Sequence, residues 1–305
     1  MKKIAIVFPG QGSQKVGMGK DLYEAIPDCK RLFDQSNDIL KKELSDICFN
    51  GPKELLTHTS YAQPGLFVVA TAIFNEIKKL PIDIRYLAGH SLGELTAYHA
   101  SEVLNFEETL TVINKRAQAM ANAYKETSGM TAVIGLEEKQ IKDILKTCKE
   151  CVVIANYNTP SQIVISGNKA GLEEAHPKLK EAKAKLIPLP VSGPFHSPLM
   201  TPASEELKKV TDNLCFNNAR FPIILNKEAK PESQQNKLKE NIPQQLIASV
   251  QWVKSIEFLK KECDTIIECG PGNVLSNLIK KIDPSIKTIP INTLESLVNF
   301  KKQIQ

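Results

Sequence analysis

The pattern of apolar residues predicts strands that alternate with helices in the first part of the chain. Residues Ile4–Phe8 are apolar and mostly β-branched, and the run ends at a Pro-Gly pair, as is typical of a buried strand that enters a loop. Apolar residues recur at helical spacing over Leu66–Leu80 and Glu107–Tyr124. Between them, a short strand is predicted at Arg85–Ala88 and a helix at Leu92–Ala100. This alternation favours an α/β fold with a mostly parallel sheet.

The pattern changes near Ser128, where six segments predict the order β-α-β-β-α-β. This order is the ferredoxin-like split βαβ pattern, which fits here into about 65 residues. The segments are Met130–Ile134, Glu138–Cys148, Val152–Ala155, Gln162–Ser166, Ala170–Lys183 and Leu186–Pro190.

The later chain returns to the first pattern, with a strand predicted at Thr265–Glu268 and a helix through Ile282. The six segments are therefore predicted to form an inserted unit. We expect a large α/β domain from residues 1–127 and 196–305, and a small ferredoxin-like α+β subdomain from residues 128–195.

Composition narrows the class of protein. The chain has 305 residues, of which 42% are hydrophobic and 24% charged, close to the average of globular proteins. The net charge of +5 is too small for a dedicated nucleic-acid binder. The longest apolar run, around Gly65–Phe74, is too short for a transmembrane helix, and the N-terminal run stops at Pro9, too early for a secretory signal. Since seven cysteines fit reduced thiols better than a disulfide framework, we expect a cytoplasmic protein.

The strongest local signal for chemistry is Gly89-His90-Ser91-Leu92-Gly93, which has the pattern G-x-S-x-G between a predicted strand and a predicted helix. The glycines permit a sharp turn that projects the Ser91 hydroxyl. The next backbone N–H can then point at a developing oxyanion. Ser91 is the candidate nucleophile, and the alternative is an ordinary serine at a strand-to-helix turn.

A nucleophilic serine needs a general base, and the chain has five histidines. His196 lies in a loop that leaves the predicted subdomain, and its position after the serine suits the hydrolase-type order. It is the candidate base, and the alternative is a histidine that only packs the loop. His90 is adjacent to the nucleophile, where geometry makes it a poor proton acceptor, and His99 falls on the following helix. His58 and His176 lie in polar surroundings and are predicted at the surface.

Four other segments carry weaker signals. Gly10–Gln14 lacks the residues of a dinucleotide or phosphate loop, and is predicted to be a flexible loop whose N–H groups could supply a second oxyanion donor. Cys148 and Cys151 are spaced as C-x-x-C but have no second pair or nearby histidine, so no metal site is predicted. Lys280–Lys281 is predicted to be a solvated helix face that could attract an acidic partner. Asn226–Asn241 is polar and lysine-rich, and is predicted to be a surface connection.

Seven runs follow one another in the order of a known family. They are Phe8–Gln14, Gly89–Glu94, Lys115–Ala117, Val164–Gly167, Phe195–Ser197, Gln245–Leu246 with Val250–Trp252, and Glu268–Gly272. Together they resemble the malonyl-CoA:acyl-carrier-protein transacylase family. One run alone is weak evidence, but seven in register are hard to attribute to chance. The expected fold is a hydrolase-like α/β core with the inserted ferredoxin-like subdomain.

The resemblance implies a role for each matching position. Ser91 would carry the acyl group as an ester, and His196 would act as the base and then as the acid for the departing thiol. Backbone N–H groups of Gln11 and Leu92 would form the oxyanion hole. Arg116 would hold the free malonyl carboxylate, because the planar guanidinium matches a carboxylate bidentately.

Three further residues are implied at the substrate. The family orients its histidine with a backbone carbonyl, which falls here in the region of Gln245. Phe195 is an aromatic residue directly before the base, a feature associated with malonyl because a ring would crowd an α-methyl branch. One methyl group is worth only about 1–3 kcal/mol, so this preference need not be absolute. His90 is the third of these residues. At position 249 this chain has serine where the family usually has proline, and this difference removes no catalytic group.

The implied activity is transfer of malonyl from malonyl-CoA to the phosphopantetheine thiol of acyl carrier protein, through a malonyl-serine intermediate. This transfer would supply fatty-acid synthesis. The expected partners are acyl carrier protein and malonyl-CoA. The chain is expected to be a monomer. We expect no permanently bound cofactor, no metal, and neither nucleic acid nor membrane as a partner. Three alternatives stay open: a transferase of a polyketide pathway, an acyl hydrolase that uses the same Ser-His pair, and a non-catalytic module that binds the carrier.

Overall fold

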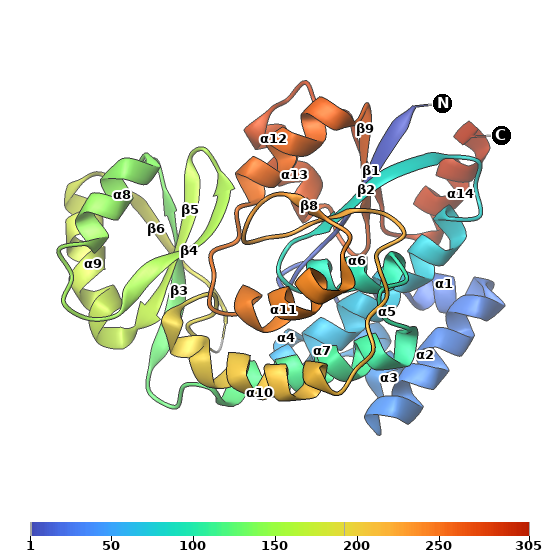
Figure 1. The fold of residues 1–305 in the computed structure, drawn as a ribbon, viewed down its shortest axis with the longest axis horizontal. Coiled ribbons are helices and arrows are strands. Elements are labelled where there is room, and N and C mark those ends of the chain that lie inside the picture. The colour runs from blue at the N-terminus through green and yellow to red at the C-terminus, as the bar shows by residue number, and fades with distance from the viewer. Residues whose placement is uncertain (1, 192, 305) are drawn as a thin grey trace.

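Two separate β-sheets form the framework of the molecule, which the computed structural model describes for residues 2–191 and 193–304 (Figure 1). The strands of the first sheet are β1 (Lys3–Phe8), β2 (Asp83–Gly89), β7 (Ile223–Ile224), β8 (Pro231–Glu232), β9 (Thr265–Cys269) and β10 (Thr288–Ile291). Their order is β10-β9-β1-β2-β7-β8, and every pair is parallel except β7 with β8. The predicted α/β fold with a mostly parallel sheet is therefore confirmed.

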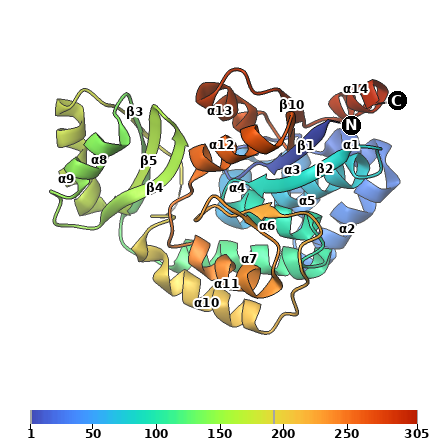
Figure 2. The same ribbon diagram turned by 45° about the horizontal axis from the view of Figure 1, so that its top comes forward.

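Helices cover both faces of this sheet. They are α1 (Lys20–Ala25), α2 (Pro27–Leu40), α3 (Leu44–Asn50), α4 (Lys53–Thr57), α5 (Thr59–Ile77), α6 (Leu92–Ala100), α7 (Phe106–Asn122), α10 (Thr201–Asp212), α11 (Gln235–Gln245), α12 (Trp252–Glu262), α13 (Val274–Ile282) and α14 (Leu294–Ile304), with a 3-10 turn at Pro198–Met200. Figure 2 shows α12 and α13 on the opposite side of β1 and β2 from α5 and α6. Along β1, Ile6 and Phe8 join the core under α5 and α6, whereas Ala5 and Val7 pack in a second core with Trp252 of α12. Because both faces are buried from Ile4 onward, the strand is apolar from Ile4 to Phe8.

The second sheet is antiparallel. Its strands are β3 (Ser128–Ile134), β4 (Val152–Thr159), β5 (Gln162–Asn168) and β6 (Lys185–Pro188), in the order β4-β5-β3-β6. Helices α8 (Glu138–Leu145) and α9 (Lys169–Glu181) pack with it around a core of their own. The sequence order β3-α8-β4-β5-α9-β6 confirms the predicted β-α-β-β-α-β pattern.

Backbone hydrogen bonds connect the two parts of the molecule. The N–H of Val250 donates to the carbonyl of Ala155 at 2.8 Å, and the N–H of Tyr157 donates to the carbonyl of Val250 at 2.9 Å. The second sheet lies within the range 128–195, but the division into domains at residues 127 and 196 stays a prediction. Residues 1, 192 and 305, which fall inside the predicted ranges, lie outside the described residues.

The segment Asn226–Asn241 lies mostly at the surface, as predicted, but its two end residues are buried. It contains β8 and most of α11, and the side chains of Asn226 and Asn241 are only 1% and 5% exposed. The polar composition did not show that these two residues are buried. Here the two amides are buried since they find hydrogen-bond partners in α6 and at its N-terminal turn.

Helix α5 begins at Thr59, earlier than the predicted start at Leu66. The first turns contain polar residues and Pro64, so they lack the apolar periodicity that indicates a helix. The earlier start matters for the site, because it puts Gln63 on a buried helical surface.

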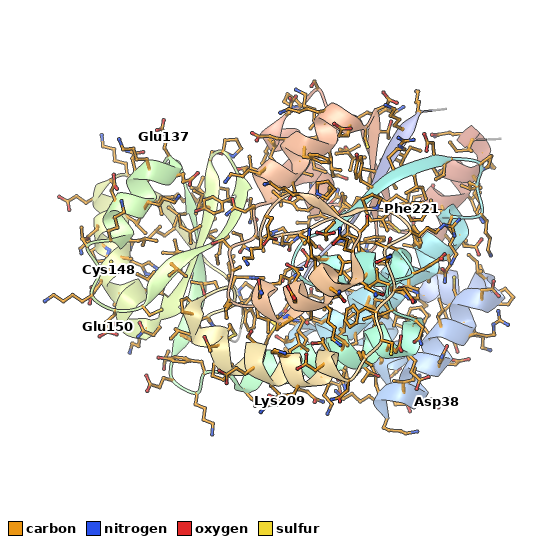
Figure 3. All side chains as sticks on the ribbon, viewed as in Figure 1. Asp38, Glu137, Cys148, Glu150, Lys209 and Phe221 are labelled. Carbon is orange, nitrogen blue, oxygen red and sulfur yellow. The ribbon has the colours of Figure 1, made fainter. Side chains whose placement is uncertain are left out.

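Several features elsewhere carry no assigned chemistry. The seven cysteines are free thiols. Figure 3 shows Cys148 near the edge of the molecule, on the side of the second sheet and its helices. Within residues 2–191 and 193–304, no cluster of three His, Cys, Asp or Glu residues could hold a metal ion. No helix in the described chain is long and apolar enough to cross a bilayer.

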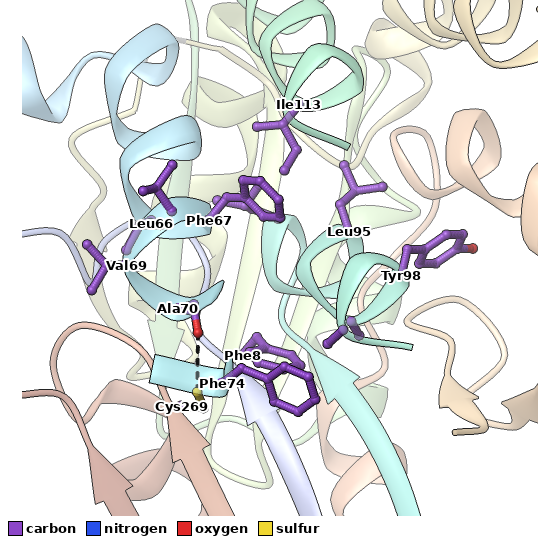
Figure 4. Close-up of a cluster of buried hydrophobic side chains, with 14 of the residues drawn as sticks. Phe8, Leu66, Phe67, Val69, Ala70, Phe74, Leu95, Tyr98, Ile113 and Cys269 are labelled. Atoms are coloured by element: carbon purple, nitrogen blue, oxygen red, sulfur yellow. Dashed lines mark hydrogen bonds between the residues drawn. The ribbon is translucent and has the colours of Figure 1, made fainter. Parts of the chain in front are cut away.

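The packing of Phe8 in the core under α5 can be tested by substitution. Phe8 is fully buried, and its ring meets that of Phe74 edge-on at 5.8 Å between centroids (Figure 4). Phe8→Ala should therefore lower the free energy of unfolding by about 3–5 kcal/mol, measured by urea denaturation. Val16, which is 41% exposed, supplies the control: Val16→Ala should change it by less than about 0.5 kcal/mol. Equal effects of the two substitutions would contradict this account of the core.

Candidate active site

Ser91 occupies a strained turn between β2 and α6. Its φ of 52° and ψ of −103° are a conformation that L-residues rarely adopt. The flanking glycines are needed because the backbone is tightly packed. A Cβ on Gly89 would lie 1.9 Å from the carbonyl carbon of Gly93, and a Cβ on Gly93 would lie 2.0 Å from the carbonyl oxygen of Phe8. The spacing G-x-S-x-G is thus a steric requirement of this turn.

The structure brings Ser91 and His196 together across 105 positions of sequence. Ser91 Oγ lies 2.7 Å from His196 Nε2. On the other side of the ring, Nδ1 lies 3.0 Å from the carbonyl oxygen of Gln245 and 3.1 Å from that of Ala248. Carbonyl oxygens only accept, so Nδ1 must carry the hydrogen and Nε2 must accept from the serine hydroxyl. The backbone of α11 and its C-terminal turn therefore fixes the tautomer that a general base needs.

The imidazole of His196 is neutral at neutral pH. Burial lowers its pKa to about 3, and the positive charge of Arg116 acts in the same direction. The carbonyl oxygens of Gln245 and Ala248 act in the opposite direction but do not reverse the shift. The base is therefore unprotonated and available to the Ser91 hydroxyl.

Arg116 reaches the same hydroxyl from α7. Its Nη2 donates to Ser91 Oγ at 3.0 Å and to Gln245 Oε1 at 2.9 Å, and its Nη1 donates to Gln63 Oε1 at 2.8 Å. Burial lowers the pKa of the guanidinium to about 10, with Glu94 acting in the opposite direction, so it stays charged. Its Nε is buried and has no partner among the described residues. A fixed positive charge with an unused donor thus lies beside the nucleophile.

A cavity of about 160 Å³ opens beside Ser91, between the two sheets. Six of the eight predicted site residues line it: Gln11, His90, Ser91, Leu92, Phe195 and His196. The other two, Arg116 and Gln245, contact Ser91 from the buried side. The second sheet contributes Met130 and Val164 to the wall, and α13 contributes Val274 and Leu278. The structure thus places all eight predicted residues at one site, while their roles stay predictions.

The hydrogen bonds around the turn bear on the predicted oxyanion hole. The N–H of Ser91 donates to Asn226 Oδ1 at 2.8 Å and is therefore not free to bind an oxyanion. Leu92 is the first residue of α6, where an N–H has no partner within the helix. Gln11 lies across the same cavity in the loop after β1. This arrangement supports the amides of Leu92 and Gln11 as the two donors.

His90 connects the turn to the second sheet. Its Nε2 lies 2.9 Å from Asn158 Oδ1 in β4, and its ring meets that of Trp252 at 5.5 Å between centroids. Burial lowers the pKa of His90. It lines the cavity wall, and its Nε2 is already engaged by the protein.

Sequence reasoning missed four polar residues at this site: Gln63, Glu94, Asn226 and Asn241. Glu94 carries the only signal that could have been used, because it is a charged residue within an otherwise apolar helical stretch. Its carboxylate is fully buried and accepts from Asn226 N–H, Asn241 Nδ2 and Gln245 Nε2. Burial raises the pKa of Glu94 to about 7, against the effect of these donors.

A serine hydroxyl bonded to a neutral imidazole at such a turn is an arrangement for acyl transfer. The acyl transferase domain family model matches residues 5–294, and the chain belongs to this family. This confirms the predicted acyltransferase class.

The relatives identify the branch of the family. The malonyl CoA-acyl carrier protein transacylase of Bacillus subtilis (strain 168) is 42% identical over 303 residues, which cover 97% of this chain and 96% of that protein. The protein of the same name from Staphylococcus aureus (strain MRSA252) is 38% identical over 308 residues, or 99% of both chains. These matches confirm the resemblance inferred from the seven runs.

Two solved structures agree with these relatives. The malonyl CoA-acyl carrier protein transacylase of Coxiella burnetii has a TM-score of 0.95 at 33% identity, over 99% of this chain and 98% of that one. A malonyl-transacylase in complex with a type II PKS acyl-carrier protein also has a TM-score of 0.95 at 33% identity, over 99% of both chains. The fold inferred from the sequence is thus shared by both.

The state of His196 can be tested directly. Because burial lowers its pKa to about 3, we expect its ring to stay neutral, with hydrogen on Nδ1, down to about pH 5. Nitrogen-15 NMR of histidine-labelled protein, assigned with His196→Ala, reports both the tautomer and the protonation state. Protonation near the ordinary histidine pKa of about 6.5 would contradict this description.

Proposed function

We propose that this chain transfers a malonyl group from malonyl-CoA to the phosphopantetheine thiol of acyl carrier protein, through an ester on Ser91. The carrying observation is the buried, charged guanidinium of Arg116, 3.0 Å from Ser91 Oγ. A fixed cation beside a nucleophile suits an acyl donor that ends in a carboxylate. The names of the relatives support the same substrate and carrier.

In the first half-reaction, His196 Nε2 takes the proton of the Ser91 hydroxyl while Oγ attacks the thioester carbonyl. The amides of Leu92 and Gln11 stabilise the tetrahedral oxyanion. Collapse breaks the carbon–sulfur bond, and His196 returns the proton to the leaving thiolate. A positioned base contributes roughly 10²–10⁴-fold and one oxyanion donor about 10²–10³-fold.

The second half-reaction reverses these roles. The carrier thiol gives its proton to His196 and attacks the ester carbonyl, and Ser91 Oγ leaves and recovers the proton. Because a thioester replaces a thioester, the overall energy change is small and the two barriers are similar. One base and one oxyanion hole therefore serve both steps.

Acyl selectivity is proposed to come from Arg116 and Phe195. In the free enzyme the guanidinium of Arg116 donates a hydrogen bond to Ser91 Oγ. Once Oγ becomes an ester oxygen, it is a weaker hydrogen-bond acceptor. The Nη2 that Oγ releases and the unpartnered Nε, which lies on the same edge of the guanidinium, can then bind the malonyl carboxylate. Phe195 lines the cavity and is 5% exposed, so its ring would restrict an α-branched acyl group.

We place the reaction in fatty-acid synthesis in the cytoplasm, with the chain acting as a monomer and without a permanently bound cofactor. The assignment to fatty-acid synthesis is supported by the relatives at 38–42% identity, whose names specify no polyketide carrier. The structure solved with a polyketide carrier is 33% identical.

The covalent intermediate is the direct test. Brief mixing with malonyl-CoA should increase the protein mass by one malonyl group, located on the Ser91 peptide by mass spectrometry. Ser91→Ala should abolish the adduct, whereas Ser161→Ala, a serine in the turn between β4 and β5, should not. Turnover with an unmodified Ser91 would refute the proposal, and rapid release of malonate without a carrier thiol would favour the hydrolase alternative.

The role of Arg116 predicts a change in selectivity. Removing one partner of a buried ion pair costs about 3–5 kcal/mol, so Arg116→Ala should lower kcat/KM for malonyl-CoA by about 10²–10⁴-fold. Acetyl-CoA should be affected much less. The control is Arg220→Ala, since Arg220 is an exposed residue paired with Glu102. If both variants kept the wild-type ratio of malonyl to acetyl transfer, the carboxylate would not bind Arg116.

A further inference from the structure

Glu94 is a buried carboxylate that faces only donors. It lies on α6, one turn after Ser91, and none of its surface is exposed. Oε2 accepts the N–H of Asn226 at 2.5 Å, and Oε1 accepts Asn241 Nδ2 at 2.7 Å and Gln245 Nε2 at 2.9 Å. Burying a carboxylate is costly, and a neutral glutamine of the same shape would cost less. What a glutamine cannot supply is acceptors on both of its terminal atoms.

The first contact connects Glu94 to the nucleophile's backbone. Asn226, whose N–H is held by Glu94, spans the turn with its side chain. Its Nδ2 donates to the carbonyl of Gly89 at 2.6 Å, and its Oδ1 accepts the N–H of Ser91 at 2.8 Å. These two bonds hold the peptide units on either side of His90, which lead into Ser91, the residue with the positive φ. The position of Asn226 therefore helps to set the position of Ser91.

The second contact connects Glu94 to the guanidinium. Gln245 Nε2 donates to Glu94 Oε1 and to the carbonyl of Ser91, which are both acceptors. The amide of Gln245 must therefore present Oε1 to Arg116 Nη2, at 2.9 Å. The direction of this one amide decides whether the guanidinium meets an acceptor or a donor.

We propose that Glu94 is a positioning residue, which sets Ser91 through Asn226 and Arg116 through Gln245. It touches neither the substrate nor the reacting atoms. The part that concerns Arg116 rests on the proposed function, whereas the part that concerns Ser91 needs only a reactive serine.

Glu94→Gln removes one acceptor and keeps the shape. If its Nε2 faces Asn226, two N–H groups oppose each other under the turn. If the Nε2 of the new glutamine faces Gln245 instead, the side-chain amide of Gln245 must turn over. The NH₂ of Gln245 then opposes Arg116, and the side-chain oxygen of Gln245 opposes the carbonyl of Ser91. One of the two contacts is lost in either orientation.

The first readout is the rate at which a fluorophosphonate labels Ser91, measured at a pH above the pKa of Glu94. Misplacing the turn should slow labelling by about tenfold to a hundredfold in Glu94→Gln. Glu94→Asp, which keeps two acceptors, should recover part of the rate. The matched control is Glu76→Gln, because Glu76, near the C-terminal end of α5, is also a buried carboxylate and is paired with Lys79 and Lys301. This control should label like the wild type even if its melting temperature falls.

A second variant separates the connection through Asn226 from the connection through Gln245. It also tests the inference if Glu94→Gln does not fold. Asn226→Ala removes the bridge across the turn and leaves Gln245 in place, so labelling should slow while the ratio of malonyl to acetyl kcat/KM stays constant. Glu94→Gln should lower that ratio as well. Wild-type labelling in either folded variant would overturn the inference. Failure of the wild type to form malonyl-serine would refute the proposed function alone, because labelling does not depend on malonyl-CoA.

Discussion

The Ser91 hydroxyl makes two hydrogen bonds of opposite direction, and the rest of the site depends on them. It donates to the neutral Nε2 of His196 and accepts from the charged Nη2 of Arg116. The first bond requires an imidazole whose hydrogen is held on Nδ1, which the carbonyls of Gln245 and Ala248 provide. The second requires a guanidinium that keeps its charge after burial. One oxygen atom thus lies between a base that removes its proton and a cation that can bind the acyl donor.

Burial makes this arrangement possible and also determines what surrounds it. Burial lowers the pKa values of His196 and Arg116 and raises that of Glu94, so each shift favours the neutral form. For the histidine this produces a ready base. The arginine keeps its charge, and both buried groups need polar partners inside an otherwise apolar molecule. The amides of Gln63 and Gln245 meet this need for Arg116.

The two sheets contribute differently to the site. The parallel sheet supplies the strained turn, because β2 and α6 approach β1 so closely that glycine is required at positions 89 and 93. The antiparallel sheet supplies a wall of the cavity through Met130 and Val164, and is held in place by bonds to the chain around Val250. The cavity therefore exists only where the two parts of the molecule meet.

The sequence by itself predicted strands β1, β2 and β9, the β-α-β-β-α-β unit and the turn at Ser91, because these depend on apolar periodicity and on glycines a few residues apart. It also placed His196 and Arg116 through the resemblance to a family. Only the tertiary structure showed that Asn226, predicted at the surface, and Glu94, which had no assigned role, support this turn. Hydropathy describes the average burial of a residue type, whereas the burial of a polar side chain depends on its own hydrogen-bond partners. Here those partners lie more than 130 positions apart, so no local pattern could reveal them.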